Sequence, residues 1–431
     1  MADVVTDLGQ LNGWFKYKYG PFFDNIPAVE KITSRLGRIR KSQQVGRGFL
    51  FPVELVLPQG VTYSRTGQGA FTINDAIAGE SQEVTVDGSQ IIVNDVLSYE
   101  AAAKAQSEGD EAFGDAAGRM MKRLQKSGHK RVELDMWYGQ ASWGQITSGT
   151  GATTNRVYVL STASFAPGIW IAMKNATLDV IDSVTTPGNW YTSNAPMIVT
   201  AVNLAARSIT VTGNATDLTA IDGAIAGGAF ILPRGATSWT NSTTFVAWNS
   251  MVGVDKIAIT NSGNLFGVST TYELFQGNTF DVGSTQLTLK KIYDGVSDAS
   301  AKLGEEVDLD VFTSFKTFNG LASDQASLRR YGAEVKNAEN GAKEITFFGL
   351  SGKLKVIPYS IVKEGEAYAL PLDRFMKVGA MDLGFNVPGR GEQFFENVPT
   401  KAGYRLQMYA SLAIVTGTPG GVTKFTNIVN Q

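Results

Sequence analysis

The sequence has no cysteine and a single histidine among its 431 residues. The lack of cysteine excludes disulfide scaffolds, cysteine-ligated zinc, iron–sulfur centres and thiol nucleophiles. One histidine, His129, excludes multi-histidine metal sites, and any Ser-His-Asp mechanism would depend on this residue alone. The absence of thiols fits assembly in a reducing cytoplasm. Several classes of enzyme are therefore removed before any motif is considered.

Long apolar runs are also missing. No stretch approaches the roughly 18 apolar residues that a membrane span needs, and the first seven residues lack the basic and apolar regions of a signal peptide. We therefore expect neither export nor membrane insertion. The 38 basic and 40 acidic residues leave a net charge of −2, which argues against a bulk polyanion binder. The 47 glycines favour a turn-rich protein with much β-structure.

Aromatic and basic side chains gather near the N-terminus. The aromatic residues offer burial energy that a free arm would leave unused, so they pack on their own domain or clasp a neighbouring subunit. The basic residues form a solvated or intersubunit salt-bridging face, or they contact phosphates without reading sequence. The candidate arm residues are Trp14, Phe15, Tyr17, Tyr19, Phe22 and Phe23, and the candidate intersubunit or DNA-facing residues are Lys31, Arg35, Arg38, Arg40, Lys41 and Arg47.

A long hairpin is predicted between residues 49 and 93. Apolar residues alternate along one face of a strand over 49–57, and a second strand is predicted over 83–93, with Asp87 and Gly88 as a turn signal. A polar, glycine-containing stretch from Gly60 to Gly79 separates them. So long a tip is usually functional in a folded domain, and we expect it to project.

A helix is predicted over 95–127. Phe113, Met120 and Leu124 fall on one helical face, and acidic residues precede basic ones, as the helix dipole favours. Ser127 and Gly128 are expected to end the helix, which would place His129 just beyond it.

The rest of the chain has mixed character. Between 165 and 235 charge falls and short strands alternate with turn residues, which predicts a small inserted β-barrel. Helices are expected at about 285–302 and 311–330. Strands are expected at 344–348, 353–362 and 404–415.

Catalytic constellations are not found. The glycines around 347–353 match neither a phosphate-binding loop nor a nucleophile elbow. The carboxylates Glu305, Glu306, Asp308 and Asp310 could serve glycoside hydrolysis or calcium binding, but the acidic start of a following helix is the simpler interpretation. The seven tryptophans are spread along the sequence and are interpreted as core and interface anchors. We predict no enzyme, no metal site and no cofactor.

The order of these elements resembles the major capsid proteins of tailed double-stranded DNA phages, which have the Hong Kong 97-type fold. Gly48 to Val53 enter the extended loop of that layout and Val84 to Ile92 leave it. The resemblance implies an α+β fold with an N-terminal arm at 1–48, an extended β-hairpin loop at 49–93, a first part of the peripheral domain at 94–164 with a spine helix at 95–127, an inserted β-barrel at 165–235, an axial domain at 236–350, and a second part of the peripheral domain with the C-terminal strands at 351–431.

The resemblance also implies a function. It suggests a structural protein that self-assembles into pentamers and hexamers of an icosahedral head around double-stranded DNA, first in the host cytoplasm and then in the virion. It implies a separate scaffolding protein and a portal as partners, and it allows for a decoration protein. Two other functions stay open. One is a secreted β-rich glycan-binding or glycan-cleaving protein, favoured by the tryptophans and carboxylates. The other is a structural component of a phage tail.

Overall fold

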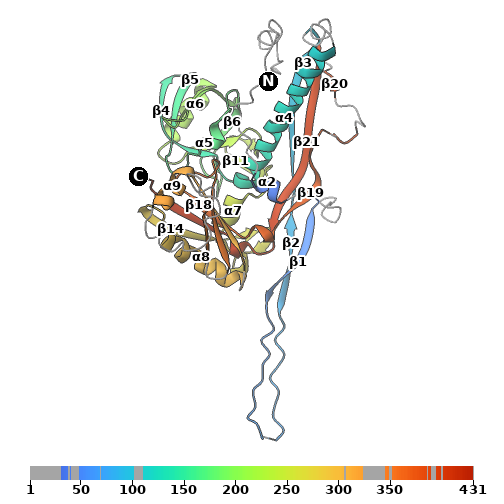
Figure 1. The fold of residues 1–431 in the computed structure, drawn as a ribbon, viewed down its shortest axis with the longest axis vertical. Coiled ribbons are helices and arrows are strands. Elements are labelled where there is room, and N and C mark those ends of the chain that lie inside the picture. Colours follow the sequence, from blue (N-terminus) through green and yellow to red (C-terminus); the bar gives the residue numbers. More distant parts are fainter. Residues whose placement is uncertain are drawn as a thin grey trace.

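Two large sheets, a closed barrel, a long helix, a projecting hairpin and smaller two-stranded sheets make up the fold (Figure 1). The computed structural model describes residues 31–36, 39, 48–67, 69–100, 110–304, 307–323, 345–348, 352–385, 387–389, 395–398 and 401–430, without the side chains of 110–119 and 347–348. Helices, sheets and a small barrel occur together, as the sequence predicts.

The largest sheet mixes parallel and antiparallel pairs and has helices on one face. Side chains of alternate strand residues, such as Val311 and Val356, pack beneath α8 (Leu289–Leu303) and α9 (Phe315–Ser323), while Phe312 and Ile357 belong to the main core. The strand order is β14 (Asn278–Thr285), β22 (Thr423–Ile428), β18 (Ala367–Leu370), β15 (Leu309–Thr313), β17 (Lys353–Pro358) and β16 (Ile345–Phe348).

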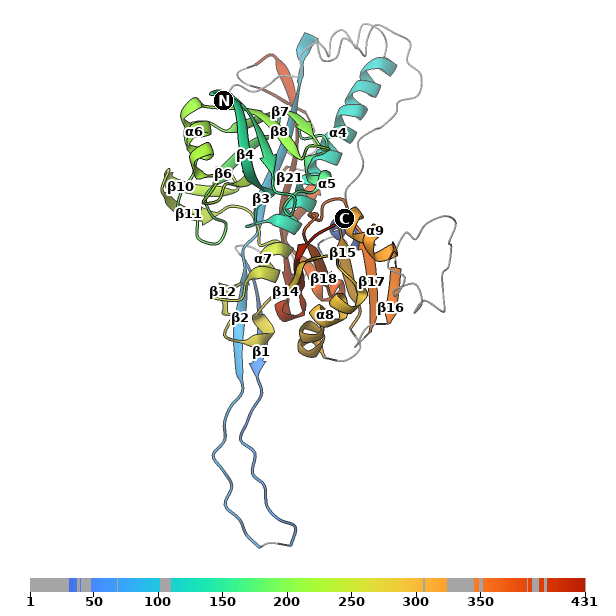
Figure 2. The same ribbon diagram turned by 90° about the vertical axis from the view of Figure 1, so that its left-hand side faces the viewer.

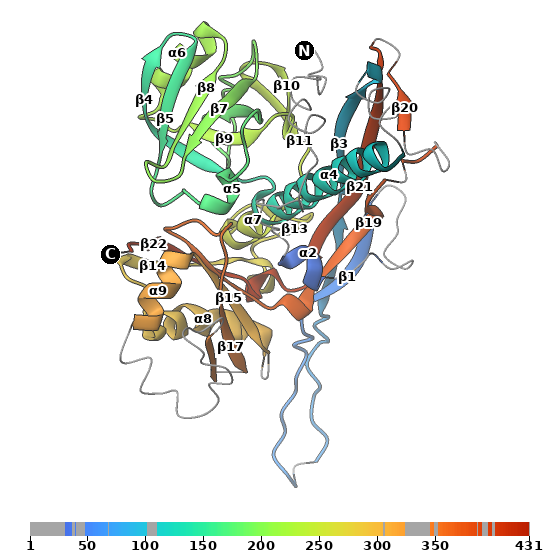
Figure 3. The same cartoon turned by 45° about the horizontal axis from the view of Figure 1, so that its top comes forward.

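A second sheet supports the long helix α4 (Asp110–Tyr138). Its 14-residue strand β21 (Gly403–Thr416) pairs with β3 (Ser89–Ser98), β19 (Phe375–Gly384) and β20 (Phe395–Asn397). Met120 and Leu124 of the helix pack against Leu406 and Met408 of β21. Figure 3 shows α4 lying between this sheet and the barrel.

The predicted helix boundaries are wrong at both ends. Residues 95–98 belong to β3, and 101–109 lie outside the described residues. The helix continues through Ser127 and Gly128 to Tyr138, so His129 is within the helix. A β-carbon on Gly128 would meet Leu383 Cδ2 at 2.9 Å. This glycine therefore permits close packing on β19 and does not end the helix.

The barrel is confirmed, but it begins earlier than predicted. Its closed order is β4 (Gly144–Ala152), β5 (Asn155–Leu160), β8 (Ser208–Thr212), β7 (Met197–Asn203), β6 (Thr177–Ile181) and β9 (Phe230–Pro233). It spans 144–233, not 165–235. Closure joins β4 to β9 through Gly144 and Ile231, which are far apart in sequence, so local patterns did not reveal the first two strands. The helix α6 (Ala215–Ala224) lies within the same segment.

Two predictions near residue 311 are also wrong. Val311 and Phe312 lie in the central strand β15, and the helix begins only at Phe315. The acidic run before them therefore does not start a helix. Residues 353–370 join the largest sheet, whereas 375–384 pair with β21, so this region divides between two sheets.

The core is continuous from the barrel to both sheets. Trp137, near the end of α4, is fully buried. Its ring lies 5.2 Å from the ring of Phe312, 5.4 Å from that of Tyr368 and 5.8 Å from that of Tyr359. The helix thus joins the parts of the molecule around one aromatic centre.

Candidate functional site

The hairpin of β1 (Phe49–Val56) and β2 (Glu80–Val86) projects far beyond the rest of the molecule (Figures 1 and 2). Its tip exposes large apolar side chains: Tyr63 is 91% exposed, Ile73 76% and Leu57 71%. Val61, Phe71 and Ile77 are exposed as well. Apolar residues gathered on one projecting element mark an interaction surface.

The base of the hairpin is firmly held, and its tip is not. Val84 and Val86 are buried in the main core, and the amide of Thr85 donates to the carbonyl of Phe266. Tyr272 donates to Glu80 Oε2 at 2.7 Å, and this bond raises the pKa of the phenol. Strand pairing ends at Val56 and Glu80. A two-stranded tip gains stability only by lying on another surface.

A buried carboxylate anchors the first described residues to α4. Glu133 is fully buried and accepts hydrogen bonds from the amides of Ile32 and Thr33, both at 2.8 Å, at the start of α2 (Ile32–Arg35). It also accepts from Tyr359 Oη at 2.7 Å and from Trp137 Nε1 at 3.2 Å. The carboxylate of Glu133 thereby holds the start of α2 against α4. Sequence reasoning missed it, because no local motif points to a glutamate a hundred residues away.

Two of the predicted basic residues contact their own chain. Arg35 pairs with Asp310 Oδ2 at 2.5 Å, and Lys31 donates to the carbonyl of Pro358 at 2.7 Å. Burial raises the pKa of Asp310 although Arg35 opposes it. The remaining basic candidates, Arg38, Arg40, Lys41 and Arg47, and the aromatic candidates Trp14, Phe15, Tyr17, Tyr19, Phe22 and Phe23, lie outside the described residues.

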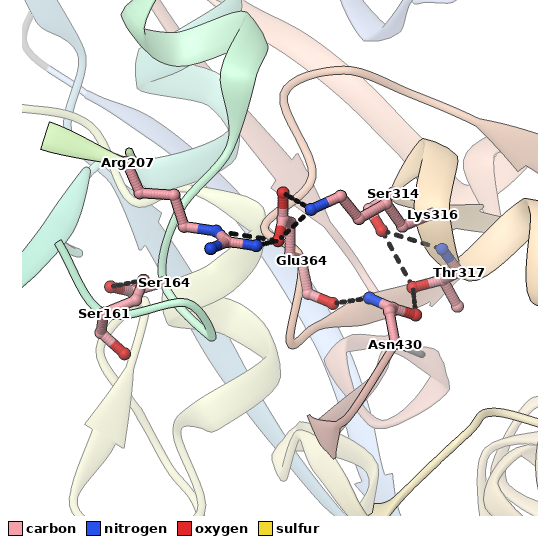
Figure 4. A network of polar contacts seen from close by, with 8 residues as sticks. All are labelled: Ser161, Ser164, Arg207, Ser314, Lys316, Thr317, Glu364 and Asn430. Carbon is pink, nitrogen blue, oxygen red and sulfur yellow. Dashed lines mark hydrogen bonds and ion pairs between the residues drawn. The ribbon is translucent and has the colours of Figure 1, made fainter. Parts of the chain in front are cut away.

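A second buried carboxylate joins the barrel to the largest sheet (Figure 4). Glu364 pairs with Arg207 of the β7–β8 turn at 3.1 Å and with Lys316 of α9 at 2.9 Å. Its carbonyl accepts from Asn430 Nδ2, and Asn430 Oδ1 accepts from Thr317 Oγ1. Ser314 lies 2.9 Å from the same hydroxyl, while Ser164 and Ser161 bond to each other nearby. The geometry is that of a structural junction.

The two described carboxylates of the acidic run, Asp308 and Asp310, each bind another group of the chain. Asp308 accepts from the amide of Lys353, and Asp310 is held by Arg35; Glu305 and Glu306 lie outside the described residues. In the described part of the chain, no group of three or more histidine, aspartate or glutamate side chains could hold a metal ion. None of the described helices is long and apolar enough to cross a membrane.

Three of the tryptophans, scattered in the sequence, come together beside the barrel. Trp190 stacks on Trp239 with ring centres 6.2 Å apart, and Phe245 joins Trp239 to Trp248 through edge contacts. Arg234 lies over Trp190 and pairs with the buried Asp179. These rings hold the hairpin of β10 (Thr237–Asn241) and β11 (Thr244–Trp248) to the barrel, which agrees with an anchoring role.

Comparisons with known proteins give the fold. No protein-family model matches the sequence, and no curated protein matches it. A chain of the solved cyanophage A-1(L) capsid asymmetric unit matches over 98% of both chains, with a TM-score of 0.52 and 11% identity. A chain of the cyanophage P-SCSP1u capsid gives a TM-score of 0.48 at 7% identity, and the match covers 98% of this chain and 95% of that one. A chain of the cyanophage Pam1 capsid asymmetric unit gives a TM-score of 0.43 at 9% identity, and the match covers 100% of both chains. The chain therefore shares its overall fold with a chain of the cyanophage A-1(L) capsid.

Proposed function

We propose that this chain is the major capsid protein of a tailed phage. In this proposal it self-assembles into the pentamers and hexamers of an icosahedral head that encloses double-stranded DNA. The observation that carries the proposal is the fold correspondence with the cyanophage A-1(L) capsid chain over 98% of both chains. A fold shared over the whole length includes the projecting elements, which a small domain match would leave out.

The projecting hairpin supports the same function. Its tip carries exposed apolar residues and lacks strand pairing beyond Val56 and Glu80. We infer that it lies over a neighbouring copy, where burial of Tyr63 and Ile73 would stabilise the contact. Many weak contacts of this kind make a closed shell stable by multivalency.

The remaining parts take their roles from the same proposal. The segment 1–48 is the N-terminal arm, α4 with the β3–β21–β19 sheet belongs to the peripheral domain, and the part of the largest sheet within 236–350, with its helices α8 and α9, belongs to the axial domain. A separate scaffolding protein, a portal and, in some particles, a decoration protein would be partners. The basic residues Arg38, Arg40, Lys41 and Arg47 would meet acidic residues of another copy or the packaged DNA. Assembly would begin in the host cytoplasm.

The test is to express the chain alone and with the neighbouring genes of its source, and to image the sedimented fraction by negative-stain electron microscopy. We expect closed shells, or rings of five and six subunits. Open tubes would point to a tail component. A small monodisperse species under both conditions would contradict the capsid function, and oligosaccharide binding by that species would favour a glycan-binding protein.

A further inference from the structure

A lysine and two acids meet where three separate elements converge in the core. Lys424 of β22 donates to Asp255 Oδ1 at 2.5 Å and to Glu366 Oε1 at 2.9 Å. Asp255 lies in the first turn of α7 (Val254–Ile259), and Glu366 directly precedes β18. The side chains of Lys424, Asp255 and Glu366 are 8%, 6% and 15% exposed. A proton here can therefore be exchanged among these groups with little water present.

Tyr368 lies between the two acids of the cluster and donates to both. The phenol oxygen lies 2.8 Å from Asp255 Oδ1 and 2.6 Å from Glu366 Oε2. The single proton of the phenol is shared between these two oxygens. This contact keeps the carboxyl group of Glu366 beside that of Asp255 and next to Lys424.

The resting form of Lys424 and Asp255 is an ion pair. Burial alone would raise the pKa of Asp255, but the charges of Lys424 and Lys363 outweigh it and the pKa lies below its ordinary value. Burial likewise opposes the charge on Lys424, but the neighbouring carboxylates raise its pKa. Transfer of one proton along the Nζ–Oδ1 contact converts this pair into a neutral amine beside a neutral acid. These are the two groups from which an amide forms.

We propose that Lys424 and Asp255 join in an amide bond within one chain, with Glu366 as the proton carrier. The Nζ lone pair attacks Cγ of Asp255 and forms the N–C bond. Glu366 takes a proton from the nitrogen and returns one to a former carboxyl oxygen of Asp255. The C–O bond breaks and that oxygen leaves as water. The sum is one amine and one carboxylic acid giving one amide and one water, with no change of oxidation state.

The Lys424–Asp255 pair is more buried than another lysine–aspartate pair of the same chain. Lys377 Nζ lies 3.1 Å from Asp382 Oδ1, but Asp382 keeps 28% of its side chain exposed. Water competes for that carboxylate and stabilises its charge. Lys377 and Asp382 therefore provide an internal control that is expected to stay unlinked.

The test is the intact mass of the full chain, purified and denatured, before any assembly. We expect the wild-type chain to lie one water molecule below the mass of its sequence. Trypsin, which cleaves after unmodified lysine, is expected to leave Lys424 uncut and to give a branched peptide that contains Asp255. A chain at its full sequence mass, with separate peptides around Asp255 and Lys424, would overturn the proposal. The readout does not depend on shell formation, so it is separate from the test of the proposed function.

A second reaction can also remove one water, and a variant distinguishes it. Succinimides form at Asp-Gly pairs, and the chain has them at Asp87, Asp222 and Asp294. Lys424→Arg keeps a buried cation but has no amine for the amide bond, so its chain is expected to regain the lost water. A water loss that persists in Lys424→Arg belongs to a succinimide and contradicts the proposal. Glu366→Gln is expected to lower the linked fraction, and an unchanged fraction would remove Glu366 from the reaction.

Discussion

At the scale of single residues, the arrangement rests on buried carboxylates whose partners come from distant parts of the chain. Glu133 is the clearest case, because it is fully buried and both of its oxygens accept hydrogen bonds. We expect Glu133→Gln to lower the free energy of unfolding by about 2–3 kcal/mol, since an amide NH₂ would face donors and leave a buried group unpaired. Urea unfolding followed by tryptophan fluorescence measures this loss.

A matched control shows whether position or charge causes that effect. Glu83→Gln removes the same charge at an exposed site of β2, and its unfolding free energy is expected to stay within about 0.5 kcal/mol of the wild type. Equal stability of both variants would mean that Glu133 does not anchor the residues at α2.

At the scale of elements, we expect the hairpin tip to be needed for assembly but not for folding of the subunit. Val56 and Glu80 are register partners, so replacing 57–79 by an Asn-Gly turn closes the hairpin at its last paired position. The subunit is expected to keep its thermal unfolding midpoint, because the removed side chains are largely exposed, and to lose the ability to close shells. Calorimetry and electron microscopy of the sedimented fraction give the two readouts.

The apolar side chains, and not the length of the tip, are expected to matter most. A full-length variant with Leu57, Tyr63 and Ile73 changed to serine should also fail to close shells. Val246→Ser, which removes an exposed apolar side chain from the β10–β11 hairpin, serves as the control and should assemble normally. Wild-type particles from the shortened chain would rule out the hairpin as a clasp.

Elements with local signals could be predicted from the sequence, and those defined by distant partners could not. The alternation at 49–57 and 404–415 marks strands because one face of each is more buried. The sequence predicts a helix end at Gly128, but the role of this glycine depends on Leu383, which is 255 positions away. Val311 and Phe312 form a short apolar run that fits a helix or a strand, and its neighbours β17 and β18 decide between them. Glu133 and Glu364 carry no local signal, so no part of these sites was predicted.

At the scale of the whole molecule, the barrel lies at the end opposite the hairpin tip (Figure 2) and is connected to the largest sheet at a small junction. The amide of Glu364 donates to the carbonyl of Phe165, that of Gly365 to Ala163, and that of Gly168 to Ser360. The side chain of Glu364 also forms ion pairs with Arg207 of the barrel and with Lys316 of α9. These polar contacts add to the continuous apolar core that joins the barrel to the largest sheet.

The Glu364 junction gives a test of how rigidly the barrel is held. Glu364→Gln is expected to lower the unfolding free energy by about 1–2 kcal/mol, less than the ~3–5 kcal/mol for a fully buried pair, because Arg207 and Lys316 keep contact with water. Amide hydrogen exchange should quicken at Gly168, Glu364 and Gly365, since the junction would open without global unfolding. Asp294→Asn breaks an exposed pair with Lys290 and should leave exchange at the junction unchanged. Slow exchange at those amides in Glu364→Gln would mean that the backbone bonds alone fix the barrel, and that the ion pairs add nothing to its orientation.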